Sequence, residues 1–448
     1  MKNDIEQAVL SETQLNEVAF LALNEAKRLG AHQAEIDIAA NKGFSVVARS
    51  GDVETVEYNQ DKVIEVTVYF GKRSGSASLS DVRPEAIKQA VEAAVHIAKY
   101  TDEDPAAGLA DKDELAFNYP KLSLAHHWPI TVEKAIELAI QCEREALQQD
   151  KRIMSAESVS VSTVDAYSLY ANSLGFIGGY PETRHDISCV LVAKEGDDMQ
   201  RDYSYTTAGN PTQLESISHI AKEAAERVVR RLGAKRIATA KVPVIFYNEE
   251  ARGLLGSFVA AISGGNLYRK ASFLLDHLNK CIFPSFVHLQ EFPLLPDALG
   301  SAPFDADGVA TRENVFIDGG ILQSYALGVY SARKLGMKTT ANAGGLHNLT
   351  IRPGNKDLAG LLKTMGKGLL ITEMMGSGAN LVTGDYSRGA AGFWVEHGEI
   401  QYPVHEITVA GKLQDMFAHM VDVGSDVDVR GNIRTGSILI EEMMVAGS

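Results

Sequence analysis

Residues 242–258, VPVIFYNEEARGLLGSF, place a short apolar strand directly before a helix. Residues 242–246 are mainly apolar and β-branched and predict a strand, and the residues after them predict a helix. The start of that helix carries Tyr247, Asn248 and Arg252. The chemistry of these three side chains is the main functional clue in the chain.

The same stretch resembles the metal-binding helix of the TldD/TldE (PmbA) family of bacterial metallopeptidases. The resemblance rests on the Gly-Leu-x-Gly-x-Phe pattern of residues 253–258. In the TldD branch this helix carries His-Glu-x-x-x-His. Alignment of the pattern puts Tyr247, Asn248 and Arg252 at the positions of the first His, the Glu and the second His.

These three residues are poor substitutes for a zinc site, which needs neutral imidazoles, carboxylates or thiolates around an open position. A phenol titrates near pH ~10 and an amide offers only a neutral oxygen. Arg252 is permanently cationic, and a single positive charge about 5 Å from a doubly charged ion costs roughly 7 kcal/mol at an effective dielectric of ~20. We therefore expect no catalytic residue and no metal ligand at Tyr247, Asn248 and Arg252.

Two further observations bear on this region. Glu249 and Arg252 stand three residues apart, so on a helix they can form an ordinary surface pair contributing ~0.2 to 0.5 kcal/mol. TldD-like members supply another metal ligand from a Cys near the C-terminus, but residues 423–428 contain no cysteine. Asp426 or Asp428 could coordinate a hard cation, yet one carboxylate without imidazoles binds zinc weakly.

Composition limits the function classes. The chain has 448 residues, 45% hydrophobic and 23% charged, which predicts two domains of a soluble globular protein. A net charge of −15 argues against nucleic acid or anionic lipid as a partner. Residues 1–10 lack a secretory signal, no run is long enough to span a membrane, and three distant cysteines favour reduced, mostly buried thiols. The expected location is cytoplasmic.

In the first half, alternating and helical patterns predict a sheet flanked by helices. Strands are expected at 34–40, 44–50, 63–70, 74–80, 155–170 and 187–193. A capping box at Ser11–Gln14 predicts the start of one helix, and further helices are expected at 85–100, 132–149 and 214–232. An acidic loop is expected at 101–120. The predicted boundary gives an N-terminal α/β domain at 1–238.

The remaining residues, 239–448, are rich in glycine and predict a β-rich α+β C-terminal domain carrying the vacated site. A hairpin is expected with strands at 314–317 and 321–326 around a Gly-Gly turn. Residues 304–312 and 376–394 closely match sequence segments of the same family and fit its PmbA branch. They supply the candidates for shaping a substrate cleft, which are Asp305, Asp307, Gly378, Asn380, Thr383, Asp385, Ser387 and Arg388. The competing interpretation is tight-turn geometry, because Gly, Asp, Asn and Ser cap such turns.

The resemblance implies dimers that enclose a cleft, with TldD and TldE acting as a heterodimer. It implies that this chain is the PmbA/TldE subunit of an intracellular metalloprotease and that zinc belongs to a TldD-like partner, while the chain itself has no cofactor. Substrates would be peptides or unfolded small proteins, as in leader-peptide removal or antitoxin breakdown. Alone, the chain could pair with itself as a homodimer.

Two alternatives remain open from the residues. The chain could be a metallopeptidase by itself, with a non-standard metal site built from the Asp-rich turns and the histidines. It could also be a nonenzymatic module that binds peptides without cleaving them. Motifs for serine hydrolases and dinucleotide binding are missing from the sequence.

Overall fold

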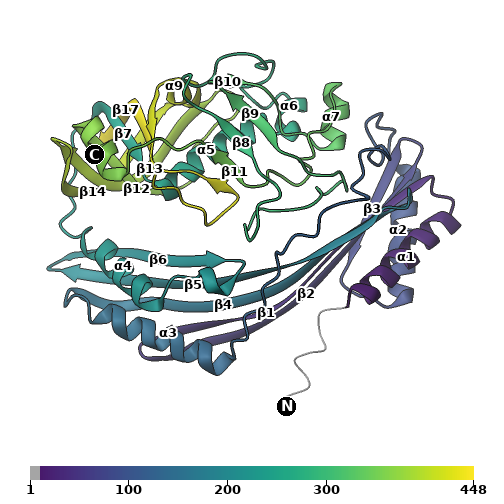
Figure 1. Cartoon of the computed structure of the whole chain (residues 1–448), viewed down its shortest axis with the longest axis horizontal. Coiled ribbons are helices and arrows are strands. Elements are labelled where there is room, and N and C mark those ends of the chain that lie inside the picture. The colour runs from purple at the N-terminus through teal and green to yellow at the C-terminus, as the bar shows by residue number, and fades with distance from the viewer. Residues whose placement is uncertain (1–10, 448) are drawn as a thin grey trace.

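The N-terminal half is one long antiparallel sheet, seen in a computed structural model that describes residues 11–447 (Figure 1). The strand order is β3-β2-β1-β4-β5-β6, and every neighbouring pair runs antiparallel. The strands are β1 Gln33–Arg49, β2 Asp52–Phe70, β3 Arg73–Leu79, β4 Ile153–Asn172, β5 Ile177–Glu195 and β6 Asp198–Ala208. The predicted strands at 34–40 and 44–50 are one continuous strand, β1.

Helices cover this sheet in two pairs at its two ends. These helices are α1 Glu12–Arg28, α2 Pro84–Tyr100, α3 Val132–Leu147 and α4 Ile217–Val229, with a 3-10 turn η1 at Pro211–Gln213. The α1–α2 pair packs on Ile64, Val66 and Val68 of β2, and the α3–α4 pair packs on a second core at the other end. The expected sheet flanked by helices is confirmed, and so is the Ser11–Gln14 capping box.

The helix expected at 214–232 is shorter than predicted. It begins only at Ile217, because Ser216 caps it by accepting from the N–H of His219, and Asn210 caps the separate 3-10 turn before it. The expected loop between α2 and α3 contains no helix or strand. Part of it covers the second face of β2, where Tyr69 packs with Ala107 and Leu109.

The C-terminal half contains two sheets wrapped around helix α5. Six strands run in the order β14-β13-β12-β7-β17-β15, and an additional β14–β17 pairing closes them into a barrel. They are β7 Ala240–Phe246, β12 Gly368–Met375, β13 Asp385–Glu396, β14 Glu399–Lys412, β15 Met420–Val423 and β17 Ile438–Gly447. The β-rich α+β class predicted for this half is confirmed.

A smaller sheet of five strands completes this half, in the order β10-β9-β8-β11-β16. Its strands are β8 Leu289–Glu291, β9 Asn314–Asp318, β10 Ile321–Leu322, β11 Leu349–Ile351 and β16 Ile433–Arg434. The helices are α5 Asn248–Ile262, α6 Gly264–Tyr268, α7 Val329–Leu335, α8 Leu358–Met365 and α9 Leu413–Ala418. The strand predicted at 321–326 is wrong beyond Leu322, because Tyr325 and Ala326 leave the sheet to pack against the α5 core.

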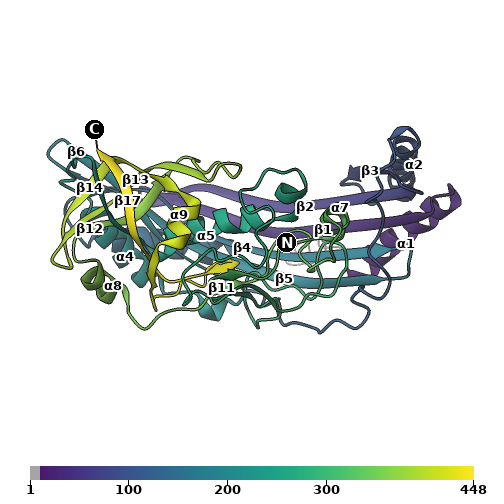
Figure 2. The same ribbon diagram turned by 90° about the horizontal axis from the view of Figure 1, so that it is seen from above.

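The C-terminal half lies against one face of the N-terminal sheet. The long strands run beneath the C-terminal half, and α1 and α2 lie beyond its edge at one end (Figures 1 and 2). Phe304 and Val309 of the C-terminal half pack against Tyr170 and Phe176 of the N-terminal half. The side of the sheet opposite its helices is therefore the inner wall of an interdomain region.

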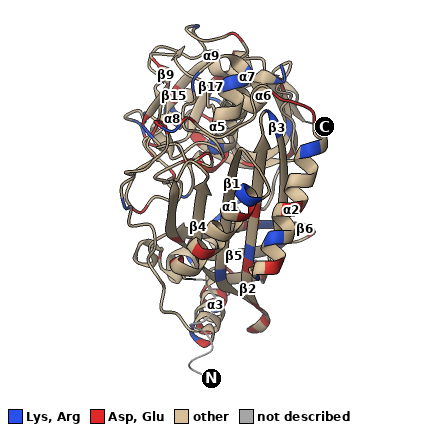
Figure 3. Cartoon of the chain, turned by 90° about the vertical axis from the view of Figure 1, so that its right-hand side faces the viewer, with Lys and Arg blue, Asp and Glu red and all other residues tan. Residues whose placement is uncertain are grey.

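The cysteines, the length of the helices and the surface charge bear on expectations from the sequence. Cys142 and Cys189 are buried and Cys281 is exposed, and all three are free, which agrees with the expectation of mostly buried thiols. Among residues 11–447, none of the helices combines the length and apolar composition that a membrane crossing requires. Acidic and basic side chains are interspersed on α1 and α2 (Figure 3). The expectation about a secretory signal at 1–10 lies outside the described residues.

Candidate functional site

The start of α5 lies where the chain passes from the barrel to the interdomain region. Tyr247 is the N-cap residue of α5 but makes no side-chain cap, and its N–H donates to the carbonyl of Ile371 at 3.0 Å. Asn248 Nδ2 donates to the carbonyl of Asp426 at 2.7 Å, and Arg252 Nη2 lies 3.4 Å from Asp428 Oδ2. The helix start and residues 423–428 thus form one site, although they are far apart in the sequence.

A buried carboxylate, Glu249, lies at the centre of this site. It accepts from Arg227 Nη2 at 2.6 Å and Nη1 at 3.2 Å, and from Arg430 Nη2 at 2.6 Å. The side chains of Arg227 and Glu249 are only 5% and 6% exposed. Because Arg227 belongs to α4 and Glu249 to α5, this ion pair joins the N-terminal half to the C-terminal half.

A second buried carboxylate, Asp428, extends the network. Its oxygens accept from Arg430 Nε at 3.0 Å and Nη2 at 3.1 Å, and its side chain is 1% exposed. Arg430 Nη1 donates to the carbonyl of Tyr205 on β6 at 2.8 Å, and its guanidinium lies 4.3 Å from the centre of the Tyr205 ring. Arg252 Nη2 donates to the Tyr205 hydroxyl at 2.8 Å. We call Arg227, Arg252, Arg430, Glu249 and Asp428 the arginine network.

Proton affinities in the arginine network show that every member is held charged. Burial raises the pKa of Glu249 and of Asp428, but the neighbouring guanidiniums outweigh it, so both pKa values lie below the ordinary range. Burial lowers the pKa of Arg430, but hydrogen bonds and charge from Asp428 and Glu249 outweigh it and raise that pKa. The network therefore carries three positive and two negative charges.

This donor set does not suit a divalent metal ion. Both carboxylates are already hydrogen-bonded to guanidiniums, and the surplus charge of the network is positive. Burial raises the pKa of the Tyr247 phenol, so it keeps its proton at neutral pH. A zinc ion needs several neutral or anionic ligands and tolerates no adjacent cation without a large electrostatic cost. These residues therefore do not fit a catalytic metal ion.

The described residues contain one other group with the ligand types of a metal site. Glu215, His219 and Glu223 offer atoms within 4.8 Å of one another on and just before α4, and the first two are exposed. Glu223 already accepts a hydrogen bond from the hydroxyl of Ser204. Exposed acidic groups on a helix surface are common without an ion, so this group does not define a site.

The expected surface pair between Glu249 and Arg252 is wrong. Glu249 is buried and bonded to Arg227 and Arg430, while Arg252 turns to Asp428 and Tyr205. Sequence reasoning missed Arg227, Arg430 and Tyr205 as members of the site. The Asp-x-Arg spacing of residues 428 and 430 and the Arg-rich end of α4 were visible signals, but nothing local indicated that they meet.

Of the cleft candidates, Asp305 and Asp307 lie at the interface of the two halves. Asp305 Oδ1 accepts from the backbone N–H groups of Asp307 and Val309, both at 3.0 Å, which is the tight-turn geometry of the competing interpretation. Asp307 Oδ2 accepts from the N–H of Val329 at 2.7 Å. Asp307 acts electrostatically on Glu35 and Asp37 of the N-terminal sheet, and Asp305 lines a cavity together with Asp37.

The other six candidates lie in the loop before β13 and at the start of β13, which pairs with β12 on one side and with β14 on the other. Asn380 Oδ1 accepts from Val382 N at 2.9 Å and Thr383 N at 3.3 Å, and Thr383 Oγ1 donates to Asp385 at 2.5 Å. These bonds are those of a capped turn. The N–H of Ser387 donates to the carbonyl of Gly378 at 2.8 Å, and a Cβ on Gly378 would lie 1.7 Å from the Ser387 carbonyl oxygen.

Arg388 is the member of this group nearest to the arginine network. Its Nε is buried without a hydrogen-bond partner, and its charge acts on Glu250, the residue after Glu249. Burial nevertheless raises the pKa of Glu250 to about 7. The structure therefore brings Arg388 to the α5 start, whereas Asp305 and Asp307 belong to a different part of the interdomain region.

The acidic group at the domain interface gives a pH-dependent stability. Burial, and then the charges of Glu35 and Glu65, raises the pKa of Asp37 to about 8. A carboxyl whose pKa is higher in the folded than in the unfolded chain makes stability fall as pH rises, here from about pH 4 to about pH 8. We expect Asp37→Asn to leave the free energy of unfolding nearly unchanged near pH 4 and to raise it at pH 8 by several kcal/mol, with about 5 kcal/mol as the upper limit.

Denaturant unfolding of both proteins at several pH values measures this difference. Asp61→Asn, which alters an exposed carboxylate on the same sheet, is the control and should shift stability equally little at every pH. A difference between Asp37→Asn and the parent that does not change with pH would contradict the prediction.

Three sequence profiles of one family match most of the chain. The PmbA/TldA metallopeptidase domain 1 matches residues 34–98, the central domain matches 125–232, and the C-terminal domain matches 239–447. The chain is 46% identical over 438 residues to a metalloprotease PmbA homolog of Haemophilus influenzae, covering 98% of this chain and 97% of that protein. It is 48% identical over 414 residues to metalloprotease PmbA of Escherichia coli O157:H7, covering 92% of each.

Solved structures agree with this fold over the whole chain. A Bacteroides thetaiotaomicron protein, provisionally described as a modulator of DNA gyrase, superposes with a TM-score of 0.91 at 27% identity, covering 98% of this chain and all of that one. TldE from Thermococcus kodakarensis superposes with a TM-score of 0.80 at 19% identity over 97% of this chain, which is a likeness of fold alone.

Proposed function

This chain belongs to the PmbA/TldA metallopeptidase family, and from that premise we propose that it is the non-catalytic, TldE-type subunit of a cytoplasmic TldD/TldE-type metalloprotease. In this proposal the chain holds no metal, and a TldD-like partner supplies the zinc and the general base. The substrates are peptides and unfolded small proteins, as in leader-peptide removal or antitoxin breakdown.

The observation that carries the proposal is the arginine network at the start of α5. Arg252 aligns with the second His of the family's metal-binding helix, and the three guanidiniums gathered there are only partly balanced by Glu249 and Asp428. Removing one partner of a buried ion pair is costly. The arginine network therefore contributes to the stability of the fold. A subunit with such a core can stabilise the interdomain region without taking part in hydrolysis.

Such a subunit contributes walls to a shared chamber. The interdomain region is bordered by a sheet with long strands, and an extended peptide can lie against strands through its backbone groups. An enclosed space admits an extended chain and excludes folded domains. The subunit thereby restricts the substrates that reach a catalytic site on the partner.

Metal content tests the first part of the proposal. We expect chain purified without chelator and exchanged into zinc-containing buffer to retain less than about a tenth of an equivalent of zinc after desalting, because the arginine network repels divalent cations. Elemental analysis by mass spectrometry measures the content. One tightly held equivalent per chain would contradict the prediction and would favour the alternative of a metallopeptidase active by itself.

Coexpression tests the second part. The chain, a TldD-like protein of the same source, and the two together are purified and sized, and cleavage of an unstructured peptide is measured. Cleavage is expected only with both proteins, and o-phenanthroline should abolish it. Chelator-sensitive cleavage by this chain alone would overturn the proposal, and tight binding of peptides with no cleavage by the pair would favour a nonenzymatic binding module.

A further inference from the structure

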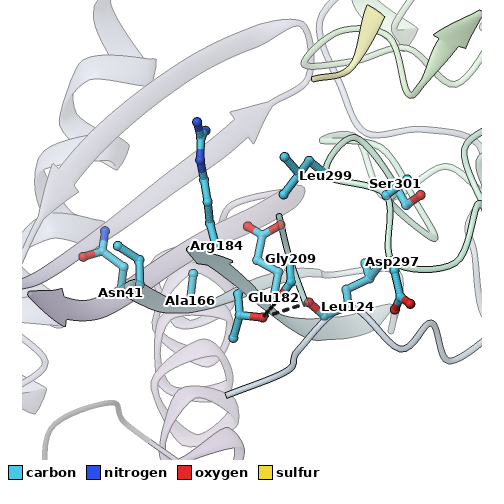
Figure 4. A pocket seen from close by; sticks show the side chains of 12 residues that line it. Asn41, Leu124, Ala166, Glu182, Arg184, Gly209, Asp297, Leu299 and Ser301 are labelled. Atoms are coloured by element: carbon cyan, nitrogen blue, oxygen red, sulfur yellow. Dashed lines mark hydrogen bonds between the residues drawn. The ribbon is translucent and has the colours of Figure 1, made fainter. Parts of the chain in front are cut away.

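Three cavities follow one another along β5, on the side of the sheet that faces the C-terminal half. The first, about 280 Å³, is lined by Tyr180, and the second, about 350 Å³, by Glu182 and Arg184 (Figure 4). The third, about 440 Å³, is lined by Thr207, which pairs with Asp186 of β5 in the sheet. We call these three cavities the sheet cleft.

The spacing along β5 gives the sheet cleft its length. Residues two apart on a strand point to the same face, so Tyr180 and Asp186, which are six positions apart, lie on one face. At about 3.3 Å per residue this distance is roughly 20 Å. A peptide of about six extended residues matches it. Loop residues Asp297, Ala298 and Leu299 line both the second and third cavities, so these two are direct neighbours.

The two ends of the sheet cleft differ in charge. Asp37 and Asp305 line the first cavity, and burial is the main reason why their pKa values are raised, to about 8 and about 7. Arg430 and Arg434 line the third cavity. A bound peptide therefore meets carboxyl groups at one end and guanidiniums at the other.

Arg434 differs from the other arginines of the site because it has no partner. In residues 11–447 its guanidinium makes no hydrogen bond or ion pair, although it is partly buried. Thr207 of the same cavity is 6% exposed, and its Oγ1 is also buried without a partner. By contrast, Arg430 Nε, Nη1 and Nη2 all donate to protein oxygens.

The carboxylates that line the third cavity do not neutralise Arg434. Asp297 accepts from His126 Nε2 at 2.7 Å and from Gln213 Nε2 at 3.3 Å. Glu215 lies 3.5 Å from His219 Nε2 and is about half exposed. A partly buried guanidinium with no anion beside it gains from an anionic group, so the third cavity is complementary to one.

We propose that Arg434 binds the C-terminal carboxylate of a peptide that lies in the sheet cleft. The inference rests on the proposed function and deepens it by assigning a direction to the substrate. A planar guanidinium holds a carboxylate through two parallel hydrogen bonds, and Leu299 and Val429 give an apolar wall for the last side chain. The opposite, acidic end of the cleft then faces residues nearer the peptide's N-terminus.

A matched pair of peptides tests this assignment. Two decapeptides of one unstructured sequence carry the same N-terminal dye and end in either a free carboxylate or an amide, and fluorescence anisotropy measures their binding to the full chain. We expect the acid to bind about tenfold to hundredfold more tightly than the amide, which is the range for hydrogen bonds between charged groups.

Variants test whether Arg434 causes the preference for the acid peptide over the amide. Arg434→Gln should weaken the acid to the affinity of the amide and leave the amide unchanged, and Arg434→Lys should keep part of the preference. Arg352→Gln removes an exposed arginine next to β11 and should change neither affinity. Thermal unfolding of each variant verifies folding, and Arg434→Lys carries the test if Arg434→Gln does not fold.

The outcomes separate this inference from the proposed function. Equal binding of acid and amide to the parent chain, or equal loss of both in Arg434→Gln, overturns the inference and leaves the proposed function standing. Failure of both peptides to bind overturns the inference, and the proposed function falls with it only if the coexpressed pair also fails to cleave.

Discussion

Glu249→Ala should lower the free energy of unfolding by about 3 to 5 kcal/mol, the range for removing one partner of a buried ion pair. The substitution leaves Arg227 without its carboxylate in an environment where that side chain is 5% exposed. It also removes one of the two anions around Arg430. Urea unfolding followed by tryptophan fluorescence measures the loss.

Glu250→Gln is the matched control because it alters the next residue of the same helix turn. Glu250 has no ion-pair partner in residues 11–447, and burial raises its pKa to about 7, so at pH 5 it is mostly protonated and a neutral amide should change stability by less than about 1 kcal/mol. Equal effects of the two substitutions would show that the arginine network is not an interacting unit.

Phe304→Ala should produce a loss of similar size, about 3 to 5 kcal/mol, because it opens a cavity in the contact between the two halves. Phe304 is 5% exposed and its ring lies 5.4 Å from Phe176, 5.4 Å from Tyr180 and 5.1 Å from Tyr119, measured between ring centres. All three neighbours belong to the N-terminal half. The variant should melt at a lower temperature and be cut faster by protease in the connections between the halves.

Phe286→Ala serves as the control for size and chemistry. Phe286 is 42% exposed, so its truncation should cost less than about 1 kcal/mol. A melting temperature of Phe304→Ala equal to that of Phe286→Ala would mean that the aromatic contact does not hold the halves together.

Local pattern was sufficient for most elements of the first half. Alternation of Ile64, Val66 and Val68 predicted only the second half of β2, and the Ser11–Gln14 box predicted the start of α1, because side-chain burial and capping act over a few residues. The failures have tertiary causes. The strand expected at 321–326 ends at Leu322 because the following side chains are drawn to the α5 core.

The candidate site shows the same division. The alignment of Tyr247, Asn248 and Arg252 predicted an unusual helix start, and the structure puts it next to Asp426 and Asp428, as the resemblance implies. The contribution of Arg227 could not be predicted, because its position near a helix C-terminus already has an ordinary explanation. Its burial against Glu249 depends on how α4 and α5 pack.

The sequence by itself determined the family and the two fold classes, and it predicts a helix start without the usual metal ligands, since each depends on residue types at short spacing. Only the tertiary structure decided that three arginines and two carboxylates form one buried network and that Arg434 is left without a partner. The physical reason is that pairing and desolvation depend on distances between side chains from different strands and helices, which local spacing does not specify.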